Sequence, residues 1–295
     1  MSTKKIITTG INGLVGSAFR RMYGEQYEIV NLGLDEGERS TDITDLAEVE
    51  RAVQVEPEAE AIMHLAAFTN VNEAFAQTGD RKGLAYKVNV EGTRNMVEMA
   101  KSYGKKLILV STAYVFDGAK TCLYTETDEP APIEWYGQTK RWAEEEVLNA
   151  DLSEAVILRI DQPFGSIPEV KPDLVQRIVK GMKTGTLYPQ FNNHYFGPTY
   201  IDDFARVMDF FLRRPKLGGI YHASSGEQWT DYDFAELVKR IGGLDYEVKV
   251  GDLEAYLASS ERPYQRNTAM SAEKLRGVLD FKLQTIEQAV AAVQF

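Results

Sequence analysis

The chain has 295 residues, 44% of them hydrophobic and 26% charged, which is typical of a folded globular protein and excludes a fibrous or disordered one. Its formal net charge of −11 argues against non-specific binding to nucleic acid or to an anionic membrane surface. No apolar run reaches membrane-spanning length and the first residues lack a signal-peptide core, so we expect a cytoplasmic protein. The chain has one cysteine and three scattered histidines, which indicates neither an internal disulfide nor a metal site.

A short strand is predicted at residues 4–9, and it runs directly into a glycine-rich turn with the spacing G-x-x-G-x-x-G. A helix at residues 17–22 follows, which completes the order of elements that a pyrophosphate site requires. Gly10 permits the tight turn, Gly13 lets backbone N–H groups approach the phosphates, and Gly16 allows close packing of the helix on the strand. The spacing differs by one residue from the commoner fingerprint, so an ordinary loop remains an alternative. The candidate dinucleotide contacts in this turn are Gly10, Asn12, Gly13, Leu14, Val15 and Gly16.

The second predicted strand covers residues 27–32 and ends near Asp35, which lies 35 − 16 = 19 residues past Gly16. An acid at this distance accepts a hydrogen bond from the ribose 2′-OH and therefore favours NAD over NADP. Arg39 argues in the other direction, and the acidic run around Asp35 is equally typical of a polar turn. The sequence thus predicts NAD or NADP as the cofactor, with a slight preference for NAD.

Strands and helices alternate through the first half of the chain. Strands are predicted at residues 61–67, 107–111 and 155–160, and helices at 90–103 and 136–148. The strands are apolar throughout rather than alternating, as expected for strands buried on both faces. This pattern predicts an α/β protein with a Rossmann-type, doubly wound parallel sheet. Such sheets bind ligands at the carboxyl ends of their strands, where Gly10, Ala66, Ala67 and Thr112 would emerge.

Beyond about Gly165 prolines become frequent and the apolar stretches become short. We therefore expect an NAD(P)-binding domain over residues 1–165 and a smaller, mainly substrate-binding lobe over residues 166–295. The lobe is predicted to be discontinuous, because segments near residues 195–225 have the pattern of elements that return to the main sheet.

Tyr136 and Lys140 are four residues apart on a predicted helix and so share one face. The ammonium can stabilise the phenolate, which predicts a lowered tyrosine pKa. Thr112 lies 136 − 112 = 24 residues earlier, at the end of a buried strand. A hydroxyl that orients a carbonyl, a phenol that passes it a proton and a lysine that tunes the phenol form an acid–base set for carbonyl reduction, with the hydride supplied by a nicotinamide.

Read in order, these motifs resemble the extended short-chain dehydrogenases/reductases and, within them, the dTDP-4-dehydrorhamnose reductase-like branch. The resemblance covers nearly the whole chain and implies a pyrophosphate site at Gly10, Gly13 and Gly16. It also implies that Lys140 and Tyr136 contact the cofactor as well as the substrate carbonyl, and that Asn89 has a structural role beneath the catalytic helix. The further residues that it assigns are Asp42 and Ile43 beside the adenine, Leu65, Ala66 and Ala67 in the cofactor cleft, and Thr69, Tyr114 and His194 as substrate contacts.

Two departures from the family pattern affect the predicted chemistry. Ala113 stands where the rhamnose reductases usually carry an aspartate, and Ala113-Tyr114 replaces the Asp-Glu pair of the related dehydratases, which argues against dehydration. Asp161 stands where the family usually has small or aromatic residues, so we expect it to alter the edge of the substrate pocket.

The predicted function is NAD(P)-dependent reduction of the 4-keto group of a nucleotide-activated deoxysugar. Two alternatives stay open: a nucleotide-sugar epimerase that uses the same residues, and a non-enzymatic regulatory subunit like the partner of methionine adenosyltransferase. The intact set of Thr112, Tyr136 and Lys140 favours an enzyme over a regulator. The expected ligand is a nucleotide sugar, with no nucleic acid or membrane partner, and a homodimer is a hypothesis drawn from the relatives alone.

Overall fold

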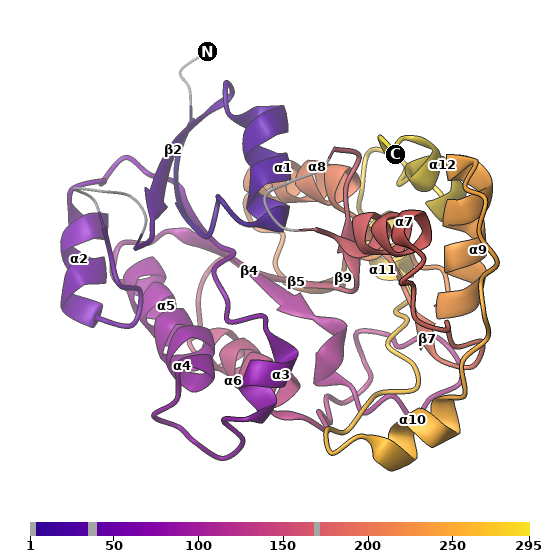
Figure 1. Cartoon of the computed structure of the whole chain (residues 1–295). Helices are drawn as coiled ribbons and strands as arrows, with labels where there is room; N and C mark the ends of the chain where they lie inside the picture. The colour runs from indigo at the N-terminus through magenta and orange to yellow at the C-terminus, as the bar shows by residue number, and fades with distance from the viewer. Residues whose placement is uncertain (1–3, 35–39, 168–171) are drawn as a thin grey trace.

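A six-stranded, wholly parallel sheet forms the centre of the molecule (Figure 1). The computed structural model describes residues 4–34, 40–167 and 172–295. The strands lie in the order β2-β1-β3-β4-β5-β9, and crossovers between them carry the helices. This confirms the predicted α/β class with a doubly wound sheet. The bounds are β1 (Lys4–Thr9), β2 (Tyr27–Leu32), β3 (Ala61–His64), β4 (Lys106–Thr112), β5 (Ala155–Ile160) and β9 (Gly219–His222).

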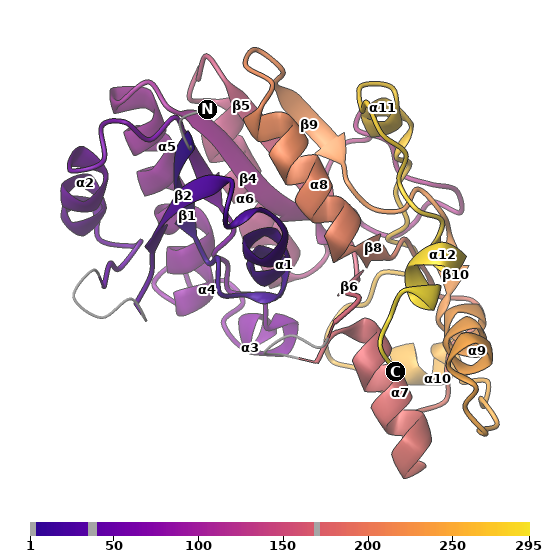
Figure 2. The same cartoon turned by 90° about the horizontal axis from the view of Figure 1, so that it is seen from above.

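Helices cover both faces of this sheet, because successive strand residues point to opposite sides and both sides are apolar (Figure 2). Ile6 of β1 faces α1 (Leu14–Tyr23) and α8 (Ile201–Leu212), whereas Ile7 faces the opposite layer. That opposite layer consists of α2 (Leu46–Gln54), α5 (Gly92–Ser102) and α6 (Trp135–Leu148).

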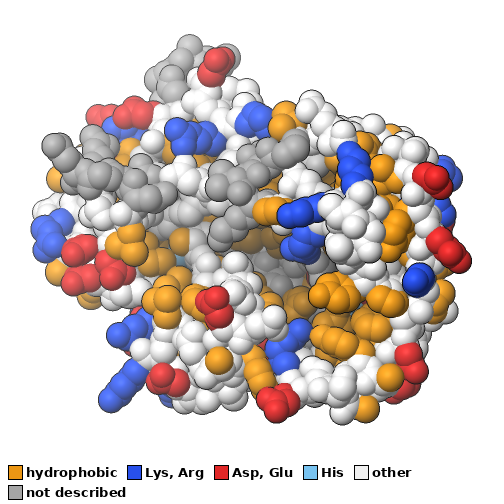
Figure 3. Space-filling model, in the orientation of Figure 1, with side chains coloured by type: hydrophobic (Ala, Val, Ile, Leu, Met, Phe, Trp, Pro, Cys, Tyr) orange, Lys and Arg blue, Asp and Glu red, His pale blue; other side chains and the backbone are white. Residues whose placement is uncertain are grey.

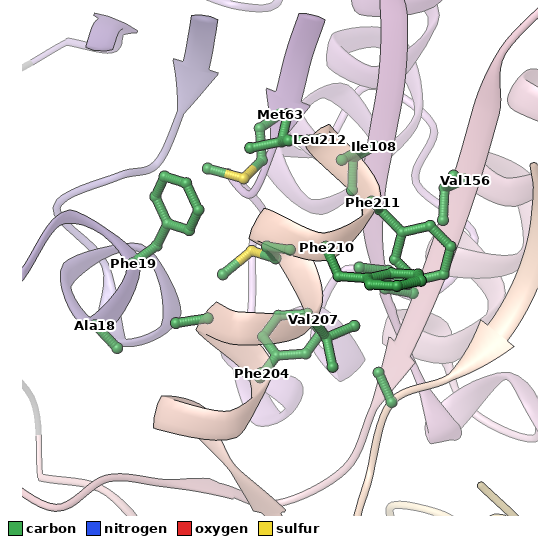
Figure 4. Packing of buried hydrophobic residues seen from close by; sticks show 14 of the residues in the cluster. Ala18, Phe19, Met63, Ile108, Val156, Phe204, Val207, Phe210, Phe211 and Leu212 are labelled. Carbon is green, nitrogen blue, oxygen red and sulfur yellow. The ribbon is translucent and has the colours of Figure 1, made fainter. Parts of the chain in front are cut away.

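The core beneath α1 and α8 is largely aromatic. Figure 4 shows Phe19 of α1 and Phe204 of α8 directed toward strand residues such as Ile108. Phe19, Phe204 and Ile108 are each no more than 1% exposed. Full burial of such a side chain stabilises a fold by about 1.5–3 kcal/mol, so this face anchors α8, which follows the proline-rich segment, to the sheet.

A second lobe has a core of its own and lies beyond the β9 edge of the sheet. Phe164, Phe196 and Phe234 are buried there, and the Phe234 ring meets each of the other two edge to face. The lobe contains the helices α7 (Leu174–Thr184), α9 (Asp231–Gly242), α10 (Leu253–Ser259) and α12 (Ile286–Ala291), and two small sheets, β6 (Pro163–Phe164) with β8 (Thr199–Tyr200) and β7 (Tyr195–Phe196) with β10 (Trp229–Thr230). The short helix α11 (Glu273–Arg276) packs instead against β9 of the main sheet.

Several element bounds differ from the sequence-based expectation. The first helix begins at Leu14 rather than at residue 17, so the last glycine of the turn is already helical. The expected helix at 90–103 is preceded by α4 (Leu84–Tyr86) and by a five-residue π-helical segment, η2 (Lys87–Glu91). Of the segments expected to return to the sheet, only β9 joins it as a strand, while α8 packs against α1. Within the described ranges, no helix is both long and apolar enough to cross a bilayer.

Candidate active site

The glycine-rich turn connects β1 to the start of α1 at the carboxyl edge of the sheet. Gly10 has a φ of +71°, a left-handed conformation, and a Cβ added there would lie 2.7 Å from the backbone nitrogen of Ala66. A Cβ on Gly16 would lie 2.5 Å from the Cα of Ile11, so this glycine lets the helix approach the turn. Gly13 is exposed and occupies the position before α1, where the described residues provide no capping side chain. The turn therefore presents backbone N–H groups with an open approach, as a pyrophosphate requires.

A buried chain of hydrogen bonds fixes the loop after β3, which forms the next part of this edge. The Thr9 hydroxyl lies 2.6 Å from His64 Nδ1 and accepts from the Ala66 N–H at 3.1 Å. His64 Nε2 lies 3.1 Å from the Thr93 hydroxyl, which donates to the Asn89 carbonyl. These partners suit a neutral imidazole with its proton on Nε2, and burial, with Lys140 nearby, lowers the pKa of His64 to about 3. Leu65, Ala66 and Ala67 follow this anchored strand end.

The residues expected beside the adenine are only partly described. Asp42 accepts from both the N–H and the hydroxyl of Thr44, at 2.9 and 2.8 Å, and so shapes the turn before α2. Ile43 is buried, and its carbonyl accepts from Asn95 Nδ2 on α5 at 2.9 Å. Asn12 accepts from Arg20 within α1. Asp35, the expected ribose ligand, lies outside the described residues.

Thr112, Tyr136 and Lys140 come together where β4 ends against the first turn of α6. Thr112 is the last residue of β4, and its hydroxyl lies close enough to the Tyr136 phenol to influence the pKa of that phenol. Lys140 is only 2% exposed and donates from Nζ to the Val110 carbonyl at 2.8 Å. The expected grouping of these three side chains is therefore present in the structure, as expected from a strand end facing an i, i+4 helical pair.

The pKa of Tyr136 differs in direction from the prediction. Burial raises the pKa of Tyr136, with Glu134 and Asp161 adding to the rise, although the hydrogen bond from Thr112 opposes it. The predicted lowering of the Tyr136 pKa by Lys140 was therefore wrong for this state of the protein. Lys140 is itself desolvated, and burial lowers its pKa to about 8. A phenol with a raised pKa is protonated at neutral pH, so Tyr136 carries the proton that reduction of a carbonyl requires.

Glu134 is the N-cap of α6, and it was not among the site residues predicted from the sequence. Its carboxylate accepts from the N–H groups of Tyr136 and Gly137, at 3.0 and 2.6 Å, and it is 5% exposed. An acid at an N-cap satisfies the unpaired donors of the first turn and complements the helix dipole. Its position two residues before Tyr136 was the signal that could have revealed it.

Tyr114, His194 and Thr69, the three expected substrate contacts, lie in different surroundings. The Tyr114 ring meets the Tyr136 ring edge to face at 5.8 Å. His194 is buried, with Nδ1 2.7 Å from Asp231, and its ring lies 4.9 Å from that of Tyr264. Thr69 is exposed in the loop between β3 and α3 (Val71–Phe75). Figure 3 shows the surface hollowed between the two lobes, with Lys and Arg side chains near the rim and hydrophobic ones gathered over the second lobe.

Asn89 has the structural position that the resemblance implied. Its amide donates to the Phe68 carbonyl at 3.2 Å and to the Thr139 hydroxyl at 2.9 Å, and its oxygen accepts from the Phe68 N–H at 2.7 Å. Asn89 lies in η2, and it thereby joins the loop after β3 to the catalytic helix. Among the described residues, no group of acidic, histidine and cysteine side chains is arranged to hold a metal ion.

Comparison with known proteins places the chain in a family. The model of the RmlD substrate binding domain matches residues 4–294. The chain is 30% identical to a dTDP-4-dehydrorhamnose reductase of Aggregatibacter actinomycetemcomitans over 78% of this chain and 76% of that protein. It is 27% identical to methionine adenosyltransferase 2 subunit beta of Rattus norvegicus over 79% of this chain and 70% of that protein.

The fold agrees with these matches. The crystal structure of dTDP-4-dehydrorhamnose reductase from Bacillus anthracis in complex with NADP superimposes with a TM-score of 0.86, at 24% identity, over 98% of each chain. The order of motifs, the doubly wound sheet and the family model agree over nearly the whole chain. The chain therefore belongs to the RmlD substrate binding domain family, a branch of the extended short-chain dehydrogenases/reductases.

Proposed function

We propose that this protein is an NAD(P)-dependent oxidoreductase that reduces the 4-keto group of a nucleotide-activated deoxysugar. The observation that carries the proposal is the contact of Thr112 with Tyr136, next to Lys140, at the sheet edge that also holds the glycine-rich turn. A hydroxyl pair with a buried, protonated phenol suits proton donation to a carbonyl oxygen.

The described residues fit a dinucleotide in several places. Gly10, Gly13 and Gly16 would face the pyrophosphate, Ala66 and the rest of the loop after β3 would line the cleft, and Asp42 would lie by the adenine. Lys140 would contact the nicotinamide ribose, and a reduced nicotinamide supplies the hydride when bound. The NADP complex of the Bacillus anthracis reductase supports this assignment.

In the proposed reaction the chain handles the substrate oxygen and its proton. Thr112 orients the carbonyl by donating a hydrogen bond, and Tyr136 transfers its phenolic proton to the carbonyl oxygen as the hydride reaches the carbon. The carbonyl thereby gains one hydride and one proton and becomes an alcohol. Lys140, whose positive charge lies one helical turn away, stabilises the phenolate left behind. Tyr114, Thr69 and His194 are the proposed contacts to the sugar nucleotide.

The choice of a nucleotide sugar rests on the family and on the relative from Aggregatibacter actinomycetemcomitans, which is named for dTDP-4-dehydrorhamnose. Epimerisation uses the same side chains, and tight retention of the cofactor after purification would favour it. A role as a non-enzymatic subunit is the second candidate, because the chain is 27% identical to methionine adenosyltransferase 2 subunit beta of Rattus norvegicus. The complete set of Thr112, Tyr136 and Lys140 favours the enzyme.

A mass-spectrometric assay tests the proposal. The purified protein is incubated with dTDP-4-dehydrorhamnose and related 4-keto nucleotide sugars, with NADH and NADPH supplied separately. We expect a product heavier by two hydrogens with at least one substrate. An isomer of unchanged mass would indicate the epimerase, and no product from any substrate, together with a stoichiometric protein partner in a pull-down, would indicate the regulatory subunit. A homodimer and a cytoplasmic location remain predictions.

A further inference from the structure

Asp161 lies directly beside the reacting pair, although the proposed chemistry does not use it. It follows Ile160, the last residue of β5, and Ile160 is the register partner of Thr112 in β4. Neighbouring strands are about 4.8 Å apart, so Asp161 emerges from the carboxyl edge next to the strand end that carries Thr112. Asp161 is 2% exposed, and it stands where the second lobe meets the sheet.

Only one of the two oxygens of this carboxyl group is satisfied. Oδ2 accepts from the Gly197 N–H at 3.0 Å and from the Thr268 hydroxyl at 2.7 Å, and the backbone N–H of Asp161 donates to the Thr199 hydroxyl at 3.0 Å. Oδ1 is buried and has no hydrogen-bond partner within the described part of the chain. Buried carboxylate oxygens normally have hydrogen-bond partners, because removing such an oxygen from water without a partner is unfavourable. Oδ1 is therefore an acceptor whose hydrogen bond is not formed within the described part of the chain.

The carboxyl group of Asp161 lies near the residues of the proposed reaction. The titratable groups that face Asp161 are Tyr136 on α6, Tyr114 in the 3-10 turn η3 (Ala113–Val115), and His194 before β7. Two of these are the catalytic phenol and its edge-to-face neighbour. The other buried carboxyl group nearby, that of Glu134, uses both oxygens on the N-terminus of α6. Asp161 therefore holds the one carboxylate oxygen among the unsatisfied buried side-chain atoms of the described residues.

We propose that Oδ1 of Asp161 accepts a hydrogen bond from an N–H or O–H donor at the reacting end of the bound ligands. The donor is the carboxamide N–H of the nicotinamide or a hydroxyl of the sugar. Gly197 and Thr268 hold the carboxyl group in place before a ligand arrives, so the acceptor is preorganised. This inference deepens the proposed function and rests on it for the identity of the two ligands.

Asp161→Asn tests the role of this oxygen. Gly197 and Thr268 both donate hydrogen bonds to Oδ2, so the amide oxygen of the new asparagine should keep that position. The amide NH₂ then takes the place of Oδ1, where it faces the donor of the bound ligand with a second donor. We expect the ligand concerned to bind at least about tenfold more weakly, since hydrogen bonds to charged groups contribute about 1.5–3 kcal/mol. Asp173→Asn is the matched control, because Asp173 is a buried carboxylate that accepts from Gly165 and Gln176 at the start of α7.

Two binding measurements by calorimetry identify the donor. The first compares NADP⁺ and NAD⁺ with their 3-acetylpyridine analogues, which lack the amide N–H. If the nicotinamide is the donor, the unsubstituted protein prefers the natural cofactors and Asp161→Asn loses that preference. The second measures dTDP-4-dehydrorhamnose against dTDP in the presence of NADP⁺, where no reduction occurs. If the sugar is the donor, Asp161→Asn loses affinity for the sugar nucleotide and keeps its affinity for dTDP.

Unchanged affinity in both measurements, in a variant that unfolds at the same temperature as the unsubstituted protein, overturns the inference. Should Asp161→Asn fail to fold, Thr268→Val replaces it, because this change keeps the carboxylate and removes a hydroxyl that positions it. A several-fold loss of affinity for one ligand is then expected, and no loss for either ligand overturns the inference. Absence of all cofactor binding by the unsubstituted protein would instead contradict the proposed function itself, and this inference with it.

Discussion

Asn89 donates from Nδ2 to the Thr139 hydroxyl at 2.9 Å, and Thr139 in turn donates to the carbonyl of Tyr136 at 2.8 Å. The π-helical segment that carries Asn89 is thus connected to the backbone of Tyr136 through buried side chains. Segments of π-helix are rare and often occur at functional sites. Here the segment places one amide where it can satisfy both the Phe68 backbone and the catalytic helix.

Asn89→Ala should therefore destabilise the protein strongly. The change removes three hydrogen bonds and leaves buried partners unsatisfied, so we expect a loss of about 2–4 kcal/mol in the free energy of unfolding. Urea unfolding followed by circular dichroism measures it. Asn193→Ala, at an exposed position, is the control and should change the stability by less than about 0.5 kcal/mol. Equal effects of the two changes would contradict this role of Asn89.

The ion pair between Glu144 and Arg159 should also be essential to stability. The guanidinium donates to both carboxylate oxygens, at 2.9 and 2.6 Å, and both side chains are at most 2% exposed. Glu144→Gln leaves a buried guanidinium without its counter-charge, so we expect a loss of about 3–5 kcal/mol.

The pair of Arg94 with Glu146, at 2.6 Å, provides the matched control because it is solvent-exposed. Glu146→Gln should change the free energy of unfolding by only about 0–1 kcal/mol. If both substitutions gave similar small losses in thermal or urea unfolding, the assignment of the Glu144 pair as a stabilising contact would be wrong.

Gly10→Ala should impair both folding and cofactor binding, because the new Cβ meets the Ala66 backbone at 2.7 Å in addition to the strain of a positive φ. Gly79 has a φ of +82° and open space around it, so Gly79→Ala imposes the strain without the contact. We expect Gly79→Ala to cost about 1 kcal/mol in unfolding free energy and to leave NADP⁺ affinity unchanged. Calorimetric titration of both variants separates the two effects, and equal affinities would contradict the close-approach role of Gly10.

His64 should make stability depend on pH. Burial holds its pKa at about 3 in the folded protein, against 6.5 for the ordinary group. Between these two values the unfolded chain binds the proton and the folded chain does not, so this contribution falls as the pH falls, by up to about 1.4 kcal/mol per pH unit.

The comparison of the unsubstituted protein with His64→Gln isolates this contribution. His222, whose pKa burial also lowers to about 3, is present in both proteins and cancels. The difference in unfolding free energy should shrink by about 1 kcal/mol between pH 7.5 and pH 5.5. A difference that does not change with pH would show that His64 is not held neutral by the fold.

Motif order and strand composition were sufficient to predict the fold and the main grouping of side chains. The uninterrupted apolar strands required a sheet covered on both faces, and the carboxyl ends of parallel strands meet at one edge. Thr112 and the glycine-rich turn therefore had to lie at that edge. The expected structural role of Asn89 likewise agrees with its hydrogen bond to Thr139 in α6.

Other features depend on tertiary contacts that no local pattern encodes. Whether Tyr136 has a raised or lowered pKa depends on its burial and on carboxylates as distant in sequence as Asp161, so the local spacing of Tyr136 and Lys140 predicted the wrong direction. The sequence pattern predicted a helix from residue 90 and did not indicate the π-helical segment before α5. The free oxygen of Asp161 became apparent only when Gly197 and Thr268, from the second lobe, were seen to bond the other one.

The most direct test of the account is the turnover of Tyr136→Phe with dTDP-4-dehydrorhamnose and NADPH, measured by mass spectrometry beside Tyr27→Phe. Tyr27 is a buried tyrosine whose hydroxyl donates to Asp209 on the far side of the sheet, so it controls for loss of a buried phenol. We expect Tyr136→Phe to lower kcat by about 100-fold or more with unchanged NADPH affinity, and Tyr27→Phe to retain kcat. Turnover by Tyr136→Phe within about threefold of the unsubstituted protein would contradict the assignment of Tyr136 as the proton donor.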